Sequence, residues 1–340
     1  SFERLKIEEL FSENKNKLNT MSNDDEDVLR ILVATDNHLG KIYTLSLSRR
    51  SLKIDARKTA GYLENDPVRG WDSFVAFEEI LKLGAEKEVD LILLGGDLFH
   101  HNKPSRQTMH RTIAMFRKYC LGEGAVRIQI VSDQKLNFKA NGGRVNFEDP
   151  NFAVQMPVFT IHGNHDDPTR NGGSGSLSAV DLVAACNLIN YFGKSETVDN
   201  VEIAPVLIKK GETKVALYGL GNVRDERLNR AWTQKNVKFV TPEDGTDDWF
   251  NIFTLHQNRD YGRGKKNCIH EHMLPEFLDL VIWGHEHECI IKPQWSTNEA
   301  FAVRSSIHHL LHTIITLKHQ RTRNTGTSTW IVCCDVSFGR

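Results

Sequence analysis

The sequence lacks any Cys-x-x-Cys pair, and its six cysteines are scattered along the chain. This spacing argues against a disulfide framework, so we expect reduced thiols in the cytosol or the nucleus. No apolar stretch approaches the roughly 20 residues of a membrane span, and the N-terminus shows no signal-peptide pattern. These absences favour an intracellular protein over a secreted or membrane-spanning one.

A strong charge of either sign is also absent, since 43 basic and 44 acidic residues leave a net charge of -1. Proteins that bind nucleic acids usually cluster lysine and arginine on one surface, so DNA binding would depend on local basic patches here. The chain has no internal repeat and no low-complexity tract. Its 340 residues, of which 39% are hydrophobic, can bury one large core or a core plus an appendage.

Five histidine and carboxylate clusters recur along the chain, each at the end of an apolar run. The runs are short and rich in β-branched residues, which is typical of strands buried between layers. They cover residues 30–35, 89–94, 157–161, 250–255 and 280–283. The clusters after them are Asp36-Asn37-His38, Gly96-Asp97, Gly163-Asn164-His165-Asp166, His256 and Gly284-His285-Glu286-His287. Because open α/β folds place their sites at the carboxyl ends of strands, we expect the clusters to converge.

The glycines before Asp97, Asn164 and His285 are expected to let the backbone turn sharply at these ends. Between the clusters, helical spacing of apolar residues predicts helices over 71–86, 104–120 and 178–189, with Pro104 opening the second. Residues 136–150 and 171–176 are interpreted as loops. The pattern predicts a layered α/β fold, with two packed central β-sheets flanked by helices.

The donor set of the clusters contains two carboxylates, one amide oxygen and four imidazoles, without a thiolate. Such mixed donors favour manganese, iron or zinc over magnesium alone and argue against a structural zinc site. Seven donors are too many for one ion but suit two ions that a carboxylate bridges, and such a pair can activate a water and stabilise a phosphate ester during displacement. The predicted ligands are Asp36, His38, Asp97, Asn164, His256, His285 and His287.

A single cluster of this kind is more often a loop or a hydrogen-bonded histidine than a metal site. The order of all five clusters, each after a strand, favours the metal site here. Seven other histidines lack such a setting and are interpreted as ordinary surface or core residues: His110, His270, His272, His308, His309, His312 and His319.

The order Asp-x-His, Gly-Gly-Asp, Gly-Asn-His-Asp, His and Gly-His-x-His resembles the calcineurin-like metallophosphoesterases. The flanking residues make the resemblance more specific, and they lie at 31–40, 66–70, 94–100, 102–106, 161–168, 217–221, 255–259 and 282–289. They are similar to the meiotic recombination eleven nuclease family, the catalytic subunits of the MRN double-strand-break repair complex. The similarity covers roughly residues 28–40 and 61–303, and motifs of this length are highly specific.

The resemblance implies a role for each matching residue. Asp36 and His38 would bind the first metal with His287, while Asn164, His256 and His285 would bind the second. Asp97 would bridge the two ions. His165 matches the family's catalytic histidine, expected to contact the scissile phosphate and help the leaving oxygen depart, and His100 matches a second active-site histidine near the first metal. A histidine titrates near neutrality and suits a general acid. The alternative for His165 is that it only supports the metal loop.

The resemblance also implies an activity and partners. It points to a nuclear, manganese-dependent DNA nuclease of double-strand-break repair, with two Mn²⁺ ions, that cuts single strands and hairpins and acts as a 3′ to 5′ exonuclease on duplex ends. It implies a homodimer formed by helices matching 104–120 and 178–190, as well as binding to an SMC-like ABC-type ATPase and a regulatory subunit of the MRN complex. Related roles would lie in meiosis and telomere maintenance.

Basic residues lie beside the second and fourth clusters, where they would position a DNA backbone without reading its sequence. The alternative is that they are solvated surface charges. The candidates for DNA contact are Lys103, Arg106, Arg259 and Arg263, with Arg111, Lys265 and Lys266 nearby.

Three segments depart from the family and define the expected domains. Residues 1–27 form an N-terminal extension that we expect to be disordered, and 28–303 form the nuclease domain. Residues 41–60 interrupt this domain with six basic residues and one acidic residue. Residues 304–340 form a divergent tail where the family's capping domain and ATPase-binding helices would follow. We hypothesise that the insert and the tail derive from intron or frameshifted sequence, or from a splice variant, and the alternative for the insert is a basic loop that contacts DNA.

Two other functions compete with the nuclease. A protein phosphatase of the same superfamily would carry Gly-Asp-x-Val-Asp-Arg-Gly, whereas this chain has Gly-Gly-Asp-Leu-Phe-His at 95–100 and so lacks the phosphate-gripping arginine. A catalytically impaired or silent scaffold is the second alternative. The complete ligand set argues against it, while the insert beside the first ligand cluster argues for it.

Overall fold

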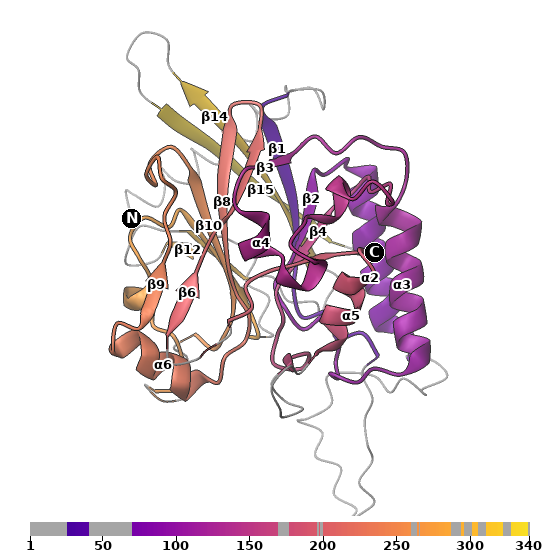
Figure 1. The fold of residues 1–340 in the computed structure, drawn as a ribbon, viewed down its shortest axis with the longest axis horizontal. Coiled ribbons are helices and arrows are strands. Elements are labelled where there is room, and N and C mark those ends of the chain that lie inside the picture. The colour runs from indigo at the N-terminus through magenta and orange to yellow at the C-terminus, as the bar shows by residue number, and fades with distance from the viewer. Residues whose placement is uncertain are drawn as a thin grey trace, which may run out of the picture.

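The computed structural model describes residues 26–40, 70–168, 177–195, 197, 200–259, 264, 266–286, 294–295, 301–304, 311–321 and 328–338. In this part of the chain two large β-sheets pack face to face, and helices cover the outer face of each (Figure 1). The predicted layered α/β fold is therefore confirmed. None of the helices in these ranges combines the length and the apolar character needed to cross a bilayer.

The first sheet has six strands in the order β15-β14-β1-β2-β4-β5. Strands β1, β2, β4 and β5 run parallel, whereas β14 pairs antiparallel with β1 and β15 pairs antiparallel with β14. The strand bounds are Ser328–Phe338, Leu311–Arg321, Val28–Ala34, Leu91–Leu94, Val158–Thr160 and Asn190–Tyr191, in the order of the sheet.

The second sheet has seven strands in the order β12-β13-β11-β10-β8-β7-β3. Its centre is parallel, because β10 pairs in parallel with both β8 and β11. The bounds are Gln294–Trp295, Phe301–Arg304, Leu280–Gly284, Phe250–His256, Thr213–Leu220, Val206–Lys210 and Gln129–Ile130, in the order of the sheet. A small parallel pair, β6 (Val201–Ile203) and β9 (Val237–Phe239), lies beside it.

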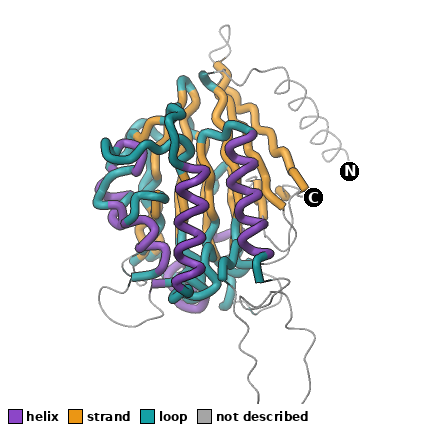
Figure 2. Tube along the Cα trace, turned by 90° about the vertical axis from the view of Figure 1, so that its right-hand side faces the viewer, coloured by secondary structure: helices purple, strands orange, loops and turns teal. Residues whose placement is uncertain are grey.

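Three α-helices cover the first sheet. The two long ones, α2 (Asp72–Glu86) and α3 (Arg106–Cys120), run side by side over the strands (Figure 2), and α5 (Ala179–Ala185) packs into the same apolar core. Helix α6 (Asp225–Thr233) contributes Leu228 to the core on the outer face of the second sheet. The short helix α4 (Gln134–Asn137) and 3₁₀ turns at Lys139–Asn141, Asn146–Glu148 and Glu271–Met273 complete the described helical elements.

Strand β1 shows how the sequence creates these layers. Leu29, Ile31 and Val33 lie in the core between the two sheets, while Leu32 and Ala34 lie in the core under the helices. Successive side chains of a strand point to opposite faces, so a strand with both faces covered has to be apolar at every position. This is why the runs before the five clusters are continuous instead of alternating.

The predicted elements agree with the structure except at their ends. All five predicted strands form, as β1, β2, β4, β10 and β11. The helix expected to open at Pro104 begins at Arg106, because the Ser105 side chain accepts a hydrogen bond from the Thr108 N–H and caps it.

The helix expected over 178–189 ends at Ala185, and Asn187 then adopts a left-handed φ of 58°. The segment 136–150, expected as a loop, contains the end of α4 and two 3₁₀ turns. The predicted loop at 171–176, the expected disorder of residues 1–25 and the insert at 41–60 lie outside the described residues.

The divergent tail supplies two strands of the first sheet. In β14, Ile315 pairs with Ile31 and Leu317 with Leu29, and both tail residues are fully buried between the sheets. This pairing was not predicted from the sequence, because residues 304–340 do not resemble the family. Strand β14 of the tail therefore belongs to the core of the fold.

A buried ion pair joins the two sheets at the end opposite to the clusters. Lys210, at the end of β7, donates hydrogen bonds to Asp90 Oδ1 at 2.7 Å, to Asp90 Oδ2 at 2.9 Å and to the Val28 carbonyl at 2.5 Å. The lysine is 3% exposed. Because β7 belongs to one sheet and Val28 to the other, this amine fixes one sheet against the other.

Candidate metal centre

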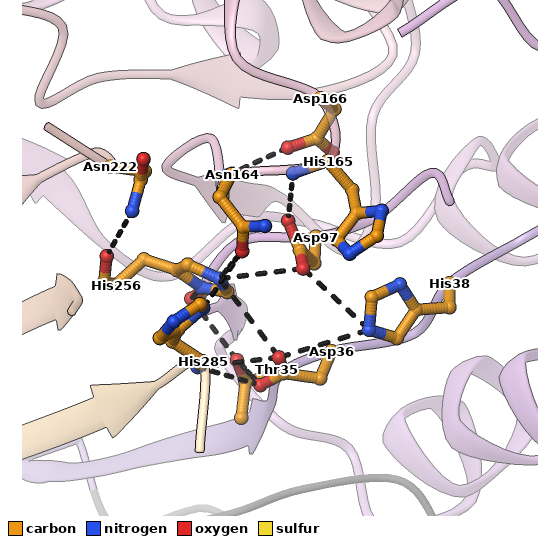
Figure 3. Close-up of polar contacts among 12 residues, drawn as sticks. Thr35, Asp36, His38, Asp97, Asn164, His165, Asp166, Asn222, His256 and His285 are labelled. Atoms are coloured by element: carbon orange, nitrogen blue, oxygen red, sulfur yellow. Dashed lines mark hydrogen bonds and ion pairs between the residues drawn. The ribbon is translucent and has the colours of Figure 1, made fainter. Parts of the chain in front are cut away.

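Six of the seven predicted metal ligands lie in the described residues, and all six meet at the carboxyl ends of the central strands (Figure 3). Asp36 and His38 follow β1, Asp97 follows β2, and Asn164 follows β4. His256 ends β10, and His285 follows β11. The seventh predicted ligand, His287, lies outside the described residues.

Asp97 lies at the centre of the group. Its Oδ2 atom is 3.6 Å from His38 Nε2 and 3.4 Å from His256 Nε2. Asp36 Oδ1 is 4.0 Å from each of the same two nitrogens. The two carboxylates therefore lie between imidazoles of different sheets, as the prediction of a bridged pair of ions requires.

Asn164 marks a second group of donors. Its Oδ1 atom is 2.8 Å from His285 Nδ1 and 3.3 Å from His256 Nε2. Neighbouring ligands around one ion have such a spacing when each metal bond is about 2.1 Å long. The ligand atoms of Asp36, His38 and Asp97 form the other group, within 4.8 Å of one another.

The charges of the site fit metal ions. Asp97 Oδ2 is buried and has no hydrogen-bond partner among the described residues, which is costly for a carboxylate oxygen. Burial would raise the pKa of Asp97, but the charges of His256 and His38 hold it well below its usual range. Burial raises the pKa of Asp36 to about 6 against the opposing charge of His256. A divalent cation bound here would neutralise the charge of the two buried carboxylates and would give the unpaired Asp97 oxygen a partner.

Hydrogen bonds behind the donors fix their orientation. A carbonyl can only accept, so the 2.8 Å contact between His256 Nδ1 and the Gly95 carbonyl means that Nδ1 carries a proton and Nε2 faces the site. The Thr35 hydroxyl donates to Asp36 Oδ2 at 2.7 Å, and the His285 N–H approaches the same oxygen at 3.1 Å. Metal-binding histidines in proteins are commonly held in this way.

The backbone at the donors adopts a conformation that side chains rarely occupy. Among the seven described non-glycine residues with positive φ are four predicted ligands: Asp36 at 57°, His38 at 47°, Asp97 at 51° and His285 at 85°. Such conformations are unfavourable and persist where the surrounding structure enforces them, often at functional sites.

The three glycines of these loops serve two purposes. Gly96 has a φ of 97° and makes the predicted sharp turn. Gly163 and Gly284 have ordinary φ values, and a Cβ atom on them would collide with Asp97 Oδ1 and with the Gly95 carbonyl. Their role is therefore close approach between the loops instead of the sharp turn that the sequence suggested.

His165 lies beside the carboxylates and is joined to Asp97. Its backbone N–H donates to Asp97 Oδ1 at 2.8 Å, and its ring Nδ1 donates to the His100 carbonyl at 2.8 Å. The His165 ring stacks on the His100 ring with centroids 4.5 Å apart and lies 4.8 Å from the His38 ring. Because Nδ1 is committed to a carbonyl, Nε2 is the nitrogen of His165 that can exchange a proton with a substrate.

Sequence reasoning missed two supporting residues. Asp166 accepts hydrogen bonds from the Gly163 N–H at 2.7 Å and the Phe99 N–H at 3.1 Å, so it joins the loops after β2 and β4. Burial, aided by the charge of Asp97, raises its pKa to about 7. His162 contacts the Tyr191 hydroxyl at 2.7 Å behind the Asn164 loop. Asp166 stands inside a quoted motif, but no local pattern marks Tyr191 as a partner of His162.

The residues predicted to contact DNA differ in their exposure to solvent. Lys103 and Arg106 are exposed near the proposed catalytic residue His100. Arg259 is 7% exposed, and its guanidinium contacts the Glu271 carboxylate, so it is not available on the surface as expected. Arg263 lies outside the described residues.

The fold and the donor set define a metal-dependent phosphoesterase, and the sequence agrees. Residues 29–289 match the family described as calcineurin-like phosphoesterase, and the chain belongs to this family. It is also a homologue of the double-strand break repair protein MRE11. The protein of that name from Oryza sativa subsp. japonica is 52% identical over 280 residues, which are 80% of this chain and 36% of the relative.

Two further proteins of the same name show a similar relationship. The protein from Arabidopsis thaliana is 50% identical over 293 residues, which cover 83% of this chain and 37% of the relative. The protein from Homo sapiens is 47% identical over 281 residues, which cover 82% of this chain and 36% of the relative. The chain thus spans little more than a third of the length of these relatives.

Proposed function

We propose that this chain is a manganese-dependent DNA nuclease that hydrolyses phosphodiesters at a two-metal centre. The observation that carries this proposal is the position of Asp97, with one carboxylate oxygen between two imidazoles and the other holding the His165 backbone. This arrangement couples the proposed metal centre directly to a histidine that can donate a proton. The family of the chain and the name of its relatives support a DNA substrate.

The donors divide into two sets around Asp97. Bound ions would lower the pKa of a water molecule and stabilise negative charge on the phosphate oxygens. Manganese suits a set that mixes carboxylate, amide and imidazole donors. Asp36, His38 and His287 would hold the first ion, Asn164, His256 and His285 the second, and Asp97 both.

His165 would act at the leaving oxygen. Its Nε2 can deliver a proton, because the His100 carbonyl occupies Nδ1 and fixes the ring. The stacked His100 ring restricts the rotation of His165 further. The substrate phosphate would then lie between the donor groups and the His165 ring.

DNA would reach this centre over Lys103 in the loop before α3 and Arg106 at the start of α3, whose exposed charges can contact phosphates of either strand without reading sequence. We propose endonuclease activity on single strands and hairpins and 3′ to 5′ exonuclease activity on duplex ends. Arg259 is left out of the proposed contacts because Glu271 binds its guanidinium.

The proposal extends to partners and location. Leu177, just before α5, and Leu182, within it, are 61% and 51% exposed, which supports a homodimer through this region. The full-length protein would join an SMC-like ABC-type ATPase and the regulatory subunit of the MRN complex, and it would act in the nucleus.

The test is cleavage of end-labelled duplex and hairpin DNA by the purified chain with Mn²⁺, beside a version without residues 41–60. The expected result is cleavage that Asp36→Ala abolishes and that His165→Asn lowers by about 10² to 10⁴. Activity close to that of the parent in the His165→Asn protein would reveal a contaminant or a wrong assignment. Cleavage only without residues 41–60 would mean that the insert disables the enzyme, and inactivity of both versions would favour the silent scaffold.

A phosphomonoester substrate tests the competing enzyme. A protein phosphatase would release phosphate from p-nitrophenyl phosphate or a phosphopeptide. We expect little release, because the chain lacks the arginine that grips the phosphate in those enzymes and carries His101 at that position of the motif. Efficient release together with inactivity on DNA would reverse the assignment.

A further inference from the structure

His101 is an exposed side chain next to the proposed catalytic pair, and no role has been assigned to it. Its ring centroid lies 4.7 Å from that of His100 at an interplanar angle of 64°. His100 in turn stacks on His165. A chain of ring contacts therefore leads from the proton donor of the proposed reaction to the exposed His101.

The loop that carries His101 is anchored on both sides. The His100 N–H donates to the Leu39 carbonyl at 3.1 Å, and the His100 carbonyl accepts from His165. Asn102 Oδ1 accepts from the Ala179 N–H at 3.3 Å. His101 stands between these two anchored residues, so its backbone is held in place before a substrate arrives. Preorganisation of this kind reduces the entropy lost on binding.

The position suits a nucleobase. A strand whose phosphate lies at the metal centre places the base of an adjoining nucleotide a few ångströms away, and an unpaired base stacks favourably on an aromatic ring. Two exposed cations follow His101, Lys103 in the same loop and Arg106 at the start of α3, and both can contact the phosphates. The His101 ring is therefore the group here that can stack on a base, whereas the two cations can contact the backbone phosphates.

We propose that His101 is a stacking platform for the unpaired nucleobase next to the scissile phosphate. The inference rests on the proposed nuclease function and makes it more specific. It assigns part of the preference for single strands and hairpins to one side chain, because a base inside a duplex already stacks on its neighbours and cannot use the platform.

A double-mutant cycle tests this role. The kcat/KM for Mn²⁺-dependent cleavage is measured for the parent chain, His101→Ala and His101→Phe. The single-stranded substrates carry an intact base or an abasic nucleotide on either side of the cut. We expect His101→Ala to lose about fivefold or more on the intact strand and almost nothing on the abasic one, and His101→Phe to retain most activity. His272→Ala, which removes an exposed histidine from the 3₁₀ turn Glu271–Met273, is the matched control and should behave like the parent.

Binding provides a second readout that does not need cleavage. Fluorescence anisotropy with the same strands is measured in a His165→Asn background with Ca²⁺ in place of Mn²⁺. The same coupling between His101 and the base is expected in Kd. Equal losses on intact and abasic strands, or a His101→Phe protein as weak as His101→Ala, would overturn the platform. If the parent cleaves no DNA, the proposed nuclease function fails, and the binding cycle still decides whether His101 contacts a base.

Discussion

At the scale of single residues, Asp97 connects the two parts of the proposed reaction. One carboxylate oxygen faces the nitrogens of His38 and His256, and the other accepts the His165 N–H at 2.8 Å. A change in the metal centre would therefore shift the proton donor as well. The His165 side chain is not one of the proposed metal ligands, so its substitution should separate chemistry from metal binding.

His165→Asn should lower kcat for DNA cleavage by about 10² to 10⁴, the usual contribution of a positioned acid. Metal binding should persist, because the His165 backbone N–H that contacts Asp97 is unchanged. Single-turnover cleavage and Mn²⁺ titration calorimetry measure the two effects. Asp97→Asn is the contrast and should lose both. A His165→Asn protein that fails to bind Mn²⁺ would instead make His165 a support of the metal loop.

Metal binding should release protons. Burial lowers the pKa of His256, but Asp97 and Asp36 outweigh it and raise the pKa to about 10 in the metal-free protein. His256 is thus protonated at pH 7 and must lose that proton to bind a metal. The affinity for Mn²⁺ should rise about tenfold per pH unit between about pH 6 and 10, and more steeply below pH 6, where Asp36 is protonated too.

Calorimetry in two buffers of different ionisation enthalpy measures this release directly. At pH 7.5 we expect about one proton per protein from His256, and the same number from His165→Asn, which keeps all the proposed ligands. A binding enthalpy that is identical in both buffers would contradict the protonated state of His256.

Some features of the site could be predicted from the sequence, and others could not. Asp36, Asp97 and His256 were predictable, because each follows a recognisable apolar strand. The Tyr191 contact of His162 was not, because it joins segments that no local pattern relates. The need for a glycine at position 163 was not predictable either, because it arises from the close approach of Asp97, which follows a different strand.

At the scale of secondary structure elements, the ion pair of β7 illustrates how strands are fixed across the core. Lys210→Met would leave Asp90 buried without its main partner, and removal of one member of a buried pair typically costs 3–5 kcal/mol. We expect about 3 kcal/mol, because Arg127 Nε also lies 3.4 Å from Asp90. Urea unfolding measures this loss.

The matched control is the double variant Lys210→Met with Asp90→Asn. The amide oxygen introduced by Asp90→Asn can still accept the hydrogen bond that the Arg30 N–H donates to Asp90 Oδ2 in the parent. It should recover part of the lost stability because no unpaired charge remains. A double variant less stable than Lys210→Met alone would mean that the charge of Asp90 is not the cause.

Element boundaries show why sequence patterns locate a helix better than they end it. The apolar spacing located α2, α3 and α5, but Ser105 and Asn187 set the actual ends of two of them through a side-chain cap and a left-handed φ. These features depend on single hydrogen bonds and backbone angles, to which hydrophobic periodicity is insensitive.

At the scale of the whole molecule, the pairing of β14 with β1 decides whether the divergent tail is part of the fold. Ile315 is fully buried opposite Ile31, so Ile315→Ala should cost about 2–5 kcal/mol by leaving a cavity. Lys318→Ala in the same strand, where the side chain is only half buried, should cost less. Guanidinium unfolding compares them. Equal stability of the Ile315→Ala and parent proteins would mean that the tail does not complete this sheet.

The order of strands also has a consequence for synthesis of the protein. β1 precedes the other strands of the two sheets in the sequence, yet one of its edges is covered by β14, which is made only after β11. While the chain grows on the ribosome, that edge offers unpaired backbone groups and apolar side chains to any extended segment it meets. Contacts between such distant segments also form slowly. A nascent chain that stalls after Arg304 would carry the metal-binding residues but could neither close its first sheet nor avoid aggregation.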